Sequence, residues 1–322
     1  MADPITDETA RALRKLWFDY LDTVAPIRPK LHAFCLRLTG SVWDAEDLLQ
    51  DTLLRGFGTI GRGDLHGSES PVSNPKAYLA RTAANLWIDT KRRRIREVQE
   101  TVEVGTPTVG AAITRSAGAA LFDRAAPQER VAVVLKDVFD FSLAEIAELL
   151  ATTEGAVKAA LHRGREKLAE DKTGMSPHGN PVSVELADRF VAAFNARDIA
   201  AVTALLLETT SFEVQGVGGG RGRRGIWVAK SIEHAAPVER RQFDGEAIVI
   251  HLSLTGEQTR LAGITRLEES GGQIARVIDY YFCPETLAFV AASFGLEAET
   301  RGYHQDSSTL AGMIASTALP WH

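Results

Sequence analysis

The stretch SLAEIAELLATTEGAVKAALHRGREKL, residues 142–168, contains two short amphipathic helices joined by a tight break. Ser142 and Glu145 have the spacing of a capping box, which predicts that the first helix begins there. Thr153 can cap the second helix in the same way. The inward-facing residues of the second helix are apolar: Val157, Leu161 and Leu168. Its other face carries cations: Lys158, His162, Arg163 and Arg165.

A helix that is apolar inside and cationic outside, and that follows a short turn, has the layout of a DNA recognition helix. Small residues on it would allow a close approach to the floor of the groove: Gly155, Ala156, Ala159 and Ala160. The same pattern also fits an αα-hairpin whose charged face is only solvated. From this stretch alone both interpretations stay open.

The whole chain has 322 residues, 45% of them hydrophobic and 24% charged, which is typical of a globular protein with two or three domains. Its net charge of −6 argues weakly against nucleic-acid binding, but the charge is unevenly distributed. The two cysteines, Cys35 and Cys283, are too few for a disulfide framework or a thiolate metal cluster. No signal peptide and no membrane-spanning run is evident. We therefore expect a cytoplasmic protein with no metal, no cofactor and no membrane partner.

Hydrophobic periodicity and composition divide the chain into six parts. Residues 10–57 are expected to be helical, 58–74 to form an exposed loop, and a long helix to run from Pro75 to Val98 with Asn74 as its cap. The resulting parts are a helical domain at 10–100, a linker at 101–119, a helical domain at 120–170, a linker at 171–182, an α+β domain at 183–296 and a tail at 297–322.

The hydrophobic pattern of the sequence changes after the second linker, from mainly helical to mixed helical and β-like. One amphipathic helix is expected at 183–207, followed by a glycine-rich stretch. Three β-like runs come next, separated by short turn-like sequences: EAIVIHLSL, TRLAGITRLEE and IARVIDYYF. This order predicts an α+β domain.

A second basic element lies in ARTAANLWIDTKRRRIRE, residues 80–97. Its polar and basic side chains recur at helical spacing: Arg81, Asn85, Lys91, Arg92, Arg93 and Arg94. These cations could simply favour the helix dipole, or they could follow a phosphate backbone. Trp87 on the same helix is more readily explained as a core residue than as a base-stacking one.

An acidic segment, DAEDLLQDTLLRGF, lies upstream of this helix. It carries polar side chains in front of a row of leucines: Asp44, Glu46, Asp47, Gln50 and Asp51. An acidic strip cannot face DNA. It is either solvated or a docking face for a basic protein partner.

Four segments resemble, in the right order, the extracytoplasmic-function (ECF) class of bacterial sigma factors, the promoter-specificity subunits of RNA polymerase. LHAFCLRLTGSVWDAEDLLQDTLLRGF is similar to the first half of sigma region 2, and NPKAYLARTAANLWIDTKRRRI to the part that melts and reads the −10 element. LFDRAAPQERVAVVLKDVFDFSLAEIAELL is similar to the start of region 4, and TTEGAVKAALHRGREKL to the −35 reader. The resemblance covers residues 10–170.

This resemblance implies roles for the residues quoted above. Asp44, Glu46, Asp47 and Gln50 would dock on the clamp helices of the largest polymerase subunit, and region 4 on the flap of the second largest. Arg81, Asn85 and Lys91 to Arg94 would contact the −10 region, and Lys158, His162, Arg163 and Arg165 the −35 region. Members often have a polar pair where this chain has Ala159-Ala160, so fewer base-edge contacts are expected here.

Residues 183–296 resemble the SnoaL-like family of cone-shaped α+β domains, which a subgroup of these sigma factors carries as a C-terminal extension. The resemblance implies regulation in cis, through contact between this domain and the sigma regions. The stretch GVGGGRGRRG, 216–225, is the expected regulatory loop, with Gly218, Gly219, Gly220, Arg221, Arg223 and Arg224. Enzymes of this fold use a buried acid or base, for which the candidates are His251, Asp279 and Asp244; we expect no catalysis.

Two alternatives stay open at the level of the sequence. A ligand-sensing, one-component regulator would explain the helix-turn-helix but would leave the acidic segment and the second basic helix without a purpose. A SnoaL-type cyclase or isomerase with a helical appendage would explain only the last third of the chain.

Overall fold

The computed structural model describes residues 4–65, 72–103, 126–170, 179–215, 218–220, 237–255, 258–300 and 302. Its contacts divide the chain into two compact units, one of residues 14–176 and one of residues 177–322 together with 1–13. We call them the helical unit and the α+β unit and describe each by itself.

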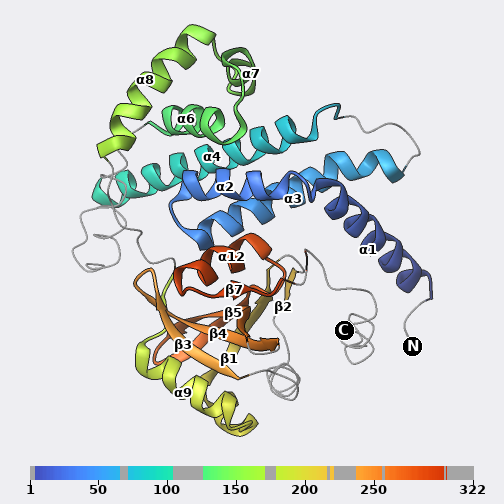
Figure 1. Ribbon diagram of the computed structural model, residues 1–322, viewed down its shortest axis with the longest axis vertical. Coiled ribbons are helices and arrows are strands. Elements are labelled where there is room, and N and C mark those ends of the chain that lie inside the picture. The colour runs from blue at the N-terminus through green and yellow to red at the C-terminus, as the bar shows by residue number, and fades with distance from the viewer. Residues whose placement is uncertain are drawn as a thin grey trace. The chain divides into compact units, whose positions relative to one another are not determined.

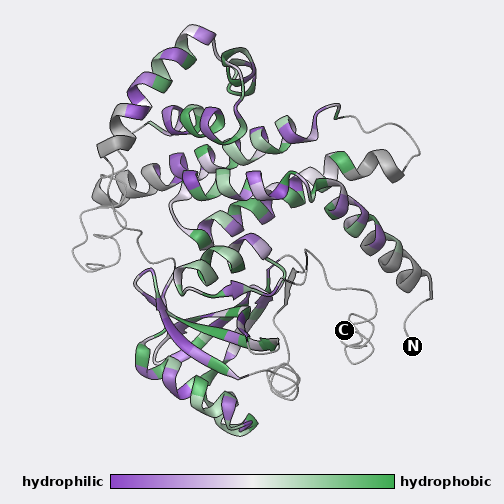
Figure 2. Cartoon of the chain, viewed as in Figure 1, coloured by the Kyte–Doolittle hydropathy of each residue, from purple (hydrophilic) through white to green (hydrophobic). Residues whose placement is uncertain are grey.

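The described residues of the helical unit form helices and the short turns between them, and α1 begins in residues that the contacts assign to the other unit (Figure 1). The helices are α1 (Pro4–Val24), α2 (Arg28–Thr39), α3 (Val42–Leu65), α4 (Pro75–Glu103), α6 (Pro127–Phe139), α7 (Leu143–Leu149) and α8 (Glu154–Glu170). Hydrophobic and hydrophilic residues alternate along them, as in amphipathic helices (Figure 2). Their apolar faces share one core, to which Phe34 of α2, Leu53 of α3 and Leu135 of α6 belong.

The predicted helix caps are confirmed. The Asn74 Oδ1 atom accepts a hydrogen bond from the Ala77 amide at 3.0 Å. Ser142 and Glu145 form the capping box, in which the Glu145 amide donates to Ser142 Oγ at 3.2 Å and the Ser142 amide to Glu145 Oε2 at 2.7 Å. The Thr153 hydroxyl caps α8 by accepting from the amide of Ala156 at 3.2 Å.

The expected loop at 58–74 is wrong over its first part, because α3 continues to Leu65. The composition is rich in glycine, but tertiary contacts hold this end of α3 in a helix. Ile60 is buried in the core, and the Tyr78 hydroxyl of α4 donates a hydrogen bond to Thr59 Oγ1 at 2.9 Å. At Gly56 a Cβ would clash with Leu79, so glycine allows α3 and α4 to approach closely.

The α+β unit combines helices with one twisted sheet (Figure 1). Its elements are α9 (Val184–Asn195), α10 (Ile199–Leu205), β1 (Leu206–Val214), β2 (Gly218–Gly220), β3 (Val238–Phe243), β4 (Glu246–Thr255), β5 (Gln258–Ser270), β6 (Gln273–Asp279), α12 (Pro284–Ser293) and β7 (Glu297–Ala298). The strand order is β2-β1-β6-β5-β4-β3, with β7 beside β5. The β1–β6 and β5–β7 pairs are parallel, and the others are antiparallel.

The three predicted strand runs are confirmed as β4, β5 and β6, but the single helix expected at 183–207 is wrong. The chain leaves α9 at Ala196, Arg197 takes a left-handed φ of 59°, and Asp198 caps α10. The last predicted helical residues, from Leu206 on, already belong to β1. The sheet is held to α9 partly by Asn195, whose amide group exchanges two hydrogen bonds with the backbone of Val238 in β3.

Candidate polymerase and DNA interfaces

The acidic segment lies on α3, and the structure separates its residues into two sides of the helix. Glu46 is fully buried, where it accepts hydrogen bonds from Arg28 Nη2 at 2.9 Å and from Gln50 Nε2 at 2.6 Å. Gln50 is also buried. The expectation that Glu46 and Gln50 point toward a partner does not match this geometry, because both side chains are engaged in a polar contact between α2 and α3.

The outer side of α3 carries an acidic stripe, which we define as Asp44, Asp47, Asp51 and Leu54. Asp44 and Asp47 are half-buried, Asp51 is exposed, and Leu54 is 59% exposed. The spacing of three, four and three residues places them on one side of a helix. Although Asp51 is exposed, partial desolvation by its surroundings and the neighbouring carboxylate of Asp47 raise its pKa. Leu54 was not predicted, although its spacing from Asp47 and Asp51 could have revealed it.

The basic helix is α4, and it displays a row of exposed side chains. Arg81 and Asn85 are exposed and lie four residues apart, and Arg92 and Arg93 are exposed further along. Lys91 is half-buried and holds its ammonium 5.5 Å from the centre of the Trp87 ring. The side chain of Arg94 lies outside the described residues. Trp87 itself is only 4% exposed, so the interpretation of this residue as part of the core is confirmed.

The helix-turn-helix consists of α7 and α8, and it packs against α6. Val157 and Leu161 are buried as expected, while Lys158 and His162 are exposed. At Gly164 a Cβ would lie 2.8 Å from Val133 Cγ2 and 3.0 Å from the carbonyl oxygen of Glu129. Glycine is therefore needed where α8 crosses α6.

The cations of α8 differ in what they contact. Arg163 Nε donates to Glu129 Oε1 at 2.6 Å, and Arg165 Nη2 lies 3.3 Å from Asp137 Oδ1, both acceptors being on α6. Lys158, His162 and Arg165 are spaced four and three residues apart, so they share one side of α8. Arg163 follows His162 directly and therefore projects about 100° away from it around the helix axis. The first turn of α8 is exposed from Glu154 to Ala156.

The glycine-rich stretch of the α+β unit is described only in part. Gly218, Gly219 and Gly220 form β2, which pairs antiparallel with Val214, Glu213 and Phe212 of β1. The predicted residues Arg221, Arg223 and Arg224 lie outside the described residues.

The inner polar residues of the sheet form a hydrogen-bonded chain. Thr265 of β5 donates to Asp279 of β6, and its Oγ1 atom lies 2.8 Å from His251 Nε2 of β4. The Tyr281 hydroxyl lies 3.0 Å from His251 Nδ1. His251, Thr265 and Asp279 are buried, and burial raises the pKa of Asp279 to about 7. Asp244, the third acid/base candidate, lies apart from them at an exposed turn with a φ of 51°.

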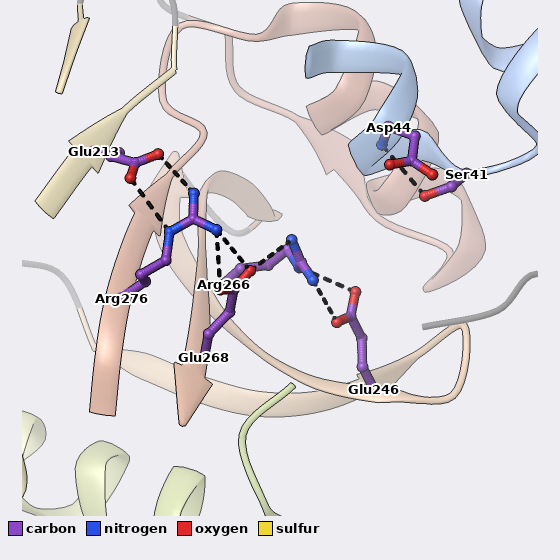
Figure 3. Close-up of polar contacts among 7 residues, drawn as sticks. All are labelled: Ser41, Asp44, Glu213, Glu246, Arg266, Glu268 and Arg276. Atoms are coloured by element: carbon purple, nitrogen blue, oxygen red, sulfur yellow. Dashed lines mark hydrogen bonds and ion pairs between the residues drawn. The ribbon is translucent and has the colours of Figure 1, made fainter. Parts of the chain in front are cut away.

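Ion pairs form a ladder across four strands of the same sheet (Figure 3). Arg266 of β5 is bidentate to Glu246 of β4, at 2.8 and 3.1 Å, and both side chains are almost fully buried. Arg276 of β6 joins Glu268 of β5 at 3.0 Å to Glu213 of β1 at 2.9 Å. Arg266 Nη1 also lies 4.0 Å from Glu268 Oε1, which joins the two groups. These charges were not predicted, and two of the pairs, Arg266 with Glu246 and Arg276 with Glu213, join residues 20 and 63 positions apart.

Comparison with known proteins identifies the family. The family model of Sigma-70 region 2 matches residues 23–97, which hold α2, α3 and most of α4. The family model of Sigma-70, region 4 matches residues 126–168, from the start of α6 through most of α8. The ECF RNA polymerase sigma factor SigL of Mycobacterium tuberculosis is 33% identical over 140 residues, which cover 41% of this chain and 76% of SigL. The chain belongs to the ECF sigma factor family.

Other relatives extend this picture of an ECF sigma factor. SigJ of Mycobacterium tuberculosis is 29% identical over 201 residues, covering 58% of this chain and 62% of SigJ. The chain thus spans less than two thirds of the length of this relative. The crystal structure of SigJ matches with 24% identity and a TM-score of 0.30, covering 80% of this chain and 95% of that one.

The predicted fold class is also confirmed. Two helical sigma regions, the second with a helix-turn-helix, precede a unit that combines helices with one mixed sheet, as an α+β domain does. Among the described helices, none is both long and apolar enough to cross a membrane. The described part of the chain likewise contains no group of three or more potential metal-ligating side chains.

Proposed function

We propose that this ECF sigma factor directs RNA polymerase core to promoter DNA, and that its α+β unit regulates this activity in cis. The observation that carries the proposal is the separation of charge within the helical unit. The acidic stripe lies on α3, whereas exposed cations lie on α4 and on α8. An initiation subunit needs these features together, because the polymerase contact and the two DNA contacts have opposite electrostatic requirements.

The polymerase contact is assigned to the outer side of α3. Asp47, Asp51 and Leu54 combine two carboxylates with an exposed apolar side chain, which suits the rim and centre of a protein interface. Their partner would be a basic and apolar surface, in this family the clamp helices of the largest subunit. The flap of the second largest subunit is the proposed partner of region 4.

The DNA contacts are assigned to two helices. Arg81, Asn85, Lys91 and the arginines at 92–94 would hold the −10 region through α4. Lys158, His162 and Arg165 would contact the −35 region through the exposed side of α8. Arg163 is the least suited of the predicted residues, because its guanidinium already pairs with Glu129. Most of these contacts would go to phosphates, since Ala159 and Ala160 offer no base-specific hydrogen bonds.

The α+β unit is proposed to act as an intramolecular regulator and not as an enzyme. Its buried His251 and Asp279 both bond to the hydroxyl of Thr265 between them, which supports a structural role for these side chains. The stretch at 216–225 is proposed as its regulatory loop, in contact with the sigma regions. We place the protein in the cytoplasm, where its proposed partners are.

Binding to purified core polymerase tests the docking assignment. Leu54→Glu and Asp51→Lys should each weaken core binding by about tenfold or more, the effect of removing a central interface contact. Asp19→Lys reverses an exposed charge on α1 that has no part in the proposed interface and should bind like the unaltered protein. Equal affinities for all four proteins would contradict the assignment.

A further inference from the structure

The hydrogen-bonded chain of the α+β unit is built by three adjacent strands. In the sheet register Thr265 of β5 stands opposite Asp279 of β6. His251 of β4 stands opposite Gly263, two residues before Thr265, so all these positions share one face of the sheet. Tyr281 follows β6 and packs its ring on Gly263, where a Cβ would clash with that ring. Glycine at this position therefore lets the Tyr281 hydroxyl reach the imidazole of His251.

This hydrogen-bonded chain leads from the interior of the unit toward its surface. Asp279 and Thr265 are only 5% and 2% exposed, whereas Tyr281 is half-buried. Thr265 bonds to Asp279, and its Oγ1 atom lies 2.8 Å from His251 Nε2. The Tyr281 hydroxyl lies 3.0 Å from His251 Nδ1 and 3.2 Å from Nε2. Because Nε2 is bonded to Thr265, we assign the hydrogen bond of Tyr281 to Nδ1.

The surroundings of the buried carboxyl group are mainly neutral. Helix α9 presents Phe194 to His251, with ring centres 6.1 Å apart, and β1 places Val214 beside Asp279. Burial raises the pKa of Asp279, and the hydrogen bond to Thr265 lowers it, with a result of about 7. A proton therefore binds to and leaves this carboxyl group near neutral pH.

The charged and titratable groups around this face of the sheet are paired, hydrogen-bonded or exposed. They are Arg240 of β3 with Asp188 of α9, Glu269 of β5 with the Ser183 amide, Cys283 with the Gln215 carbonyl oxygen, and the exposed Glu185, Arg189 and Glu208. The ion-pair ladder lies on the opposite face, because Arg266 alternates with Thr265 along β5. Among the described residues, burial and Thr265 therefore set the protonation of Asp279.

The direction of the three hydrogen bonds depends on one proton, because each hydroxyl group has only one hydrogen to donate. When Asp279 is ionised, Thr265 donates to it and accepts from the Nε2–H of His251, while Nδ1 accepts from Tyr281. When Asp279 is protonated, its O–H donates to Thr265, which donates to Nε2, and Nδ1–H donates to the Tyr281 oxygen. Protonation of Asp279 thus reverses all three bonds and exchanges the tautomer of His251.

The same geometry provides a route for that proton. A hydronium ion at the half-exposed hydroxyl gives a proton to the Tyr281 oxygen, whose own hydrogen moves to His251 Nδ1. The Nε2 hydrogen moves to Thr265, and the Thr265 hydrogen moves to Asp279. Each group between water and Asp279 gives one hydrogen and receives one. The net change is that hydronium becomes water and the carboxylate becomes a neutral carboxylic acid.

We propose that this hydrogen-bonded chain is a proton-binding site of the α+β unit, in which Asp279 holds the proton and Tyr281 exchanges it with water. In the ionised form the Tyr281 hydroxyl hydrogen points toward His251, and in the protonated form it points away. The state of a buried carboxyl group thereby changes the hydrogen bonding of a half-exposed one. The site goes beyond the proposed function and does not depend on it.

The tautomer of His251 is the direct readout. The full chain is labelled with ¹⁵N at histidine, and His251→Gln identifies the signals of this residue. The ring hydrogen should be on Nδ1 at about pH 6 and on Nε2 at about pH 8, with a single change centred near pH 7. The infrared band of the protonated carboxyl group, identified with Asp279→Asn, should disappear over the same range. One tautomer throughout, or hydrogen on both nitrogens at about pH 6, would overturn the site.

Thr265→Val removes the connecting hydroxyl and keeps the branched shape of the side chain. His251 should then keep one tautomer across this range, and the infrared midpoint should rise by about one pH unit, because the carboxylate loses its donor. Thr265→Ser is the matched control, since it keeps the hydroxyl and should preserve both results. Equal behaviour of the two variants would overturn the site.

Two further variants test the ends of the hydrogen-bonded chain. Asp279→Asn should fix one tautomer of His251 at every pH, and a tautomer change that persists in it would overturn the site. Tyr281→Phe should slow the exchange of the His251 ring hydrogen with water, and an unchanged rate would overturn exchange through Tyr281. These measurements need neither polymerase nor DNA. Failure of the site therefore leaves the proposed function intact, and failure to bind core polymerase leaves the site intact.

Discussion

The two units use charged residues in opposite ways. In the helical unit most side chains with a proposed role are exposed, including Arg81 on α4 and Lys158 on α8. In the α+β unit Arg266 and Glu246 are almost fully buried and pair with each other. The same residue types thus serve recognition in one unit and the integrity of the sheet in the other. Exposure to solvent, and not residue type, separates the two roles.

The largest expected effect tests the buried pair. Arg266→Met leaves Glu246 buried without its bidentate partner and should destabilise the α+β unit by about 3–5 kcal/mol. Calorimetry of the full chain measures this as a lower unfolding temperature of one transition. The double variant Arg266→Met/Glu246→Leu should recover most of the loss, because no uncompensated charge remains.

Arg240→Ala is the matched control for this prediction. Its ion pair with Asp188 is partly exposed, so its loss should cost only about 0–1 kcal/mol. An equal cost for Arg266→Met and Arg240→Ala would break the comparison between buried and exposed charges.

The next effect concerns Asp279, whose pKa is about 7 in the folded chain and 3.8 ordinarily. Between these values the folded state binds more protons than the unfolded state, so stability is greatest at low pH and falls as pH rises. From pH 5 to pH 8 the α+β unit should lose about 3 kcal/mol. Asp279→Asn should remove this dependence, and the exposed control Asp244→Asn should not. Unfolding temperatures of both variants, measured from pH 5 to pH 8, show whether the pH dependence is lost only in Asp279→Asn.

A smaller effect separates two glycines of α8. Gly164→Ala should destabilise region 4 by about 1–3 kcal/mol, because the added Cβ would meet Val133 and the backbone of Glu129. Gly155→Ala on the same helix meets no atom closer than 4.0 Å and should stabilise it by about 0.5–1 kcal/mol. Thermal unfolding of both variants measures the difference, and a shift of the same sign in both would refute the close crossing of α6 and α8.

The smallest expected effect is that of one exposed cation. Lys158→Ala should weaken promoter binding of the polymerase complex about equally for different −35 sequences and reduce the slope of log K against log salt by about 1. Lys15→Ala removes an exposed cation of α1 that pairs with Asp19 and should leave the slope unchanged. A change in sequence preference without a change in slope would mean that Lys158 reads bases.

Local features could be predicted from the sequence because their causes are local. The capping box of Ser142 and Glu145 and the cap at Asn74 each depend on residues three positions apart. The strands β4, β5 and β6 are long and apolar enough to be recognised. The charged edge strand β3 and the break between α9 and α10 lack such a signal, since contacts between distant residues, such as that of Asn195 with Val238, fix them in place.

The candidate site shows the same limit. Glu46 and Asp47 are adjacent acids, yet one is buried and the other is half-exposed. The difference arises from Arg28, which is 18 residues away and whose direction no pattern in α3 reveals. The contact of Lys76 with Phe139, across 63 residues, is equally invisible to periodicity. The sequence identifies which helices carry the proposed interfaces, whereas tertiary contacts determine which of their side chains are buried and which are exposed.

Run-off transcription with purified core polymerase is the most direct test of the central claim, that this ECF sigma factor directs initiation. The template is a promoter recovered by selecting random DNA with the reconstituted complex. The account predicts a discrete transcript that requires both core and this protein, and that is lost with Leu54→Glu and kept with Asp19→Lys. Specific DNA binding by the protein alone, with no transcript when core is added, would contradict it.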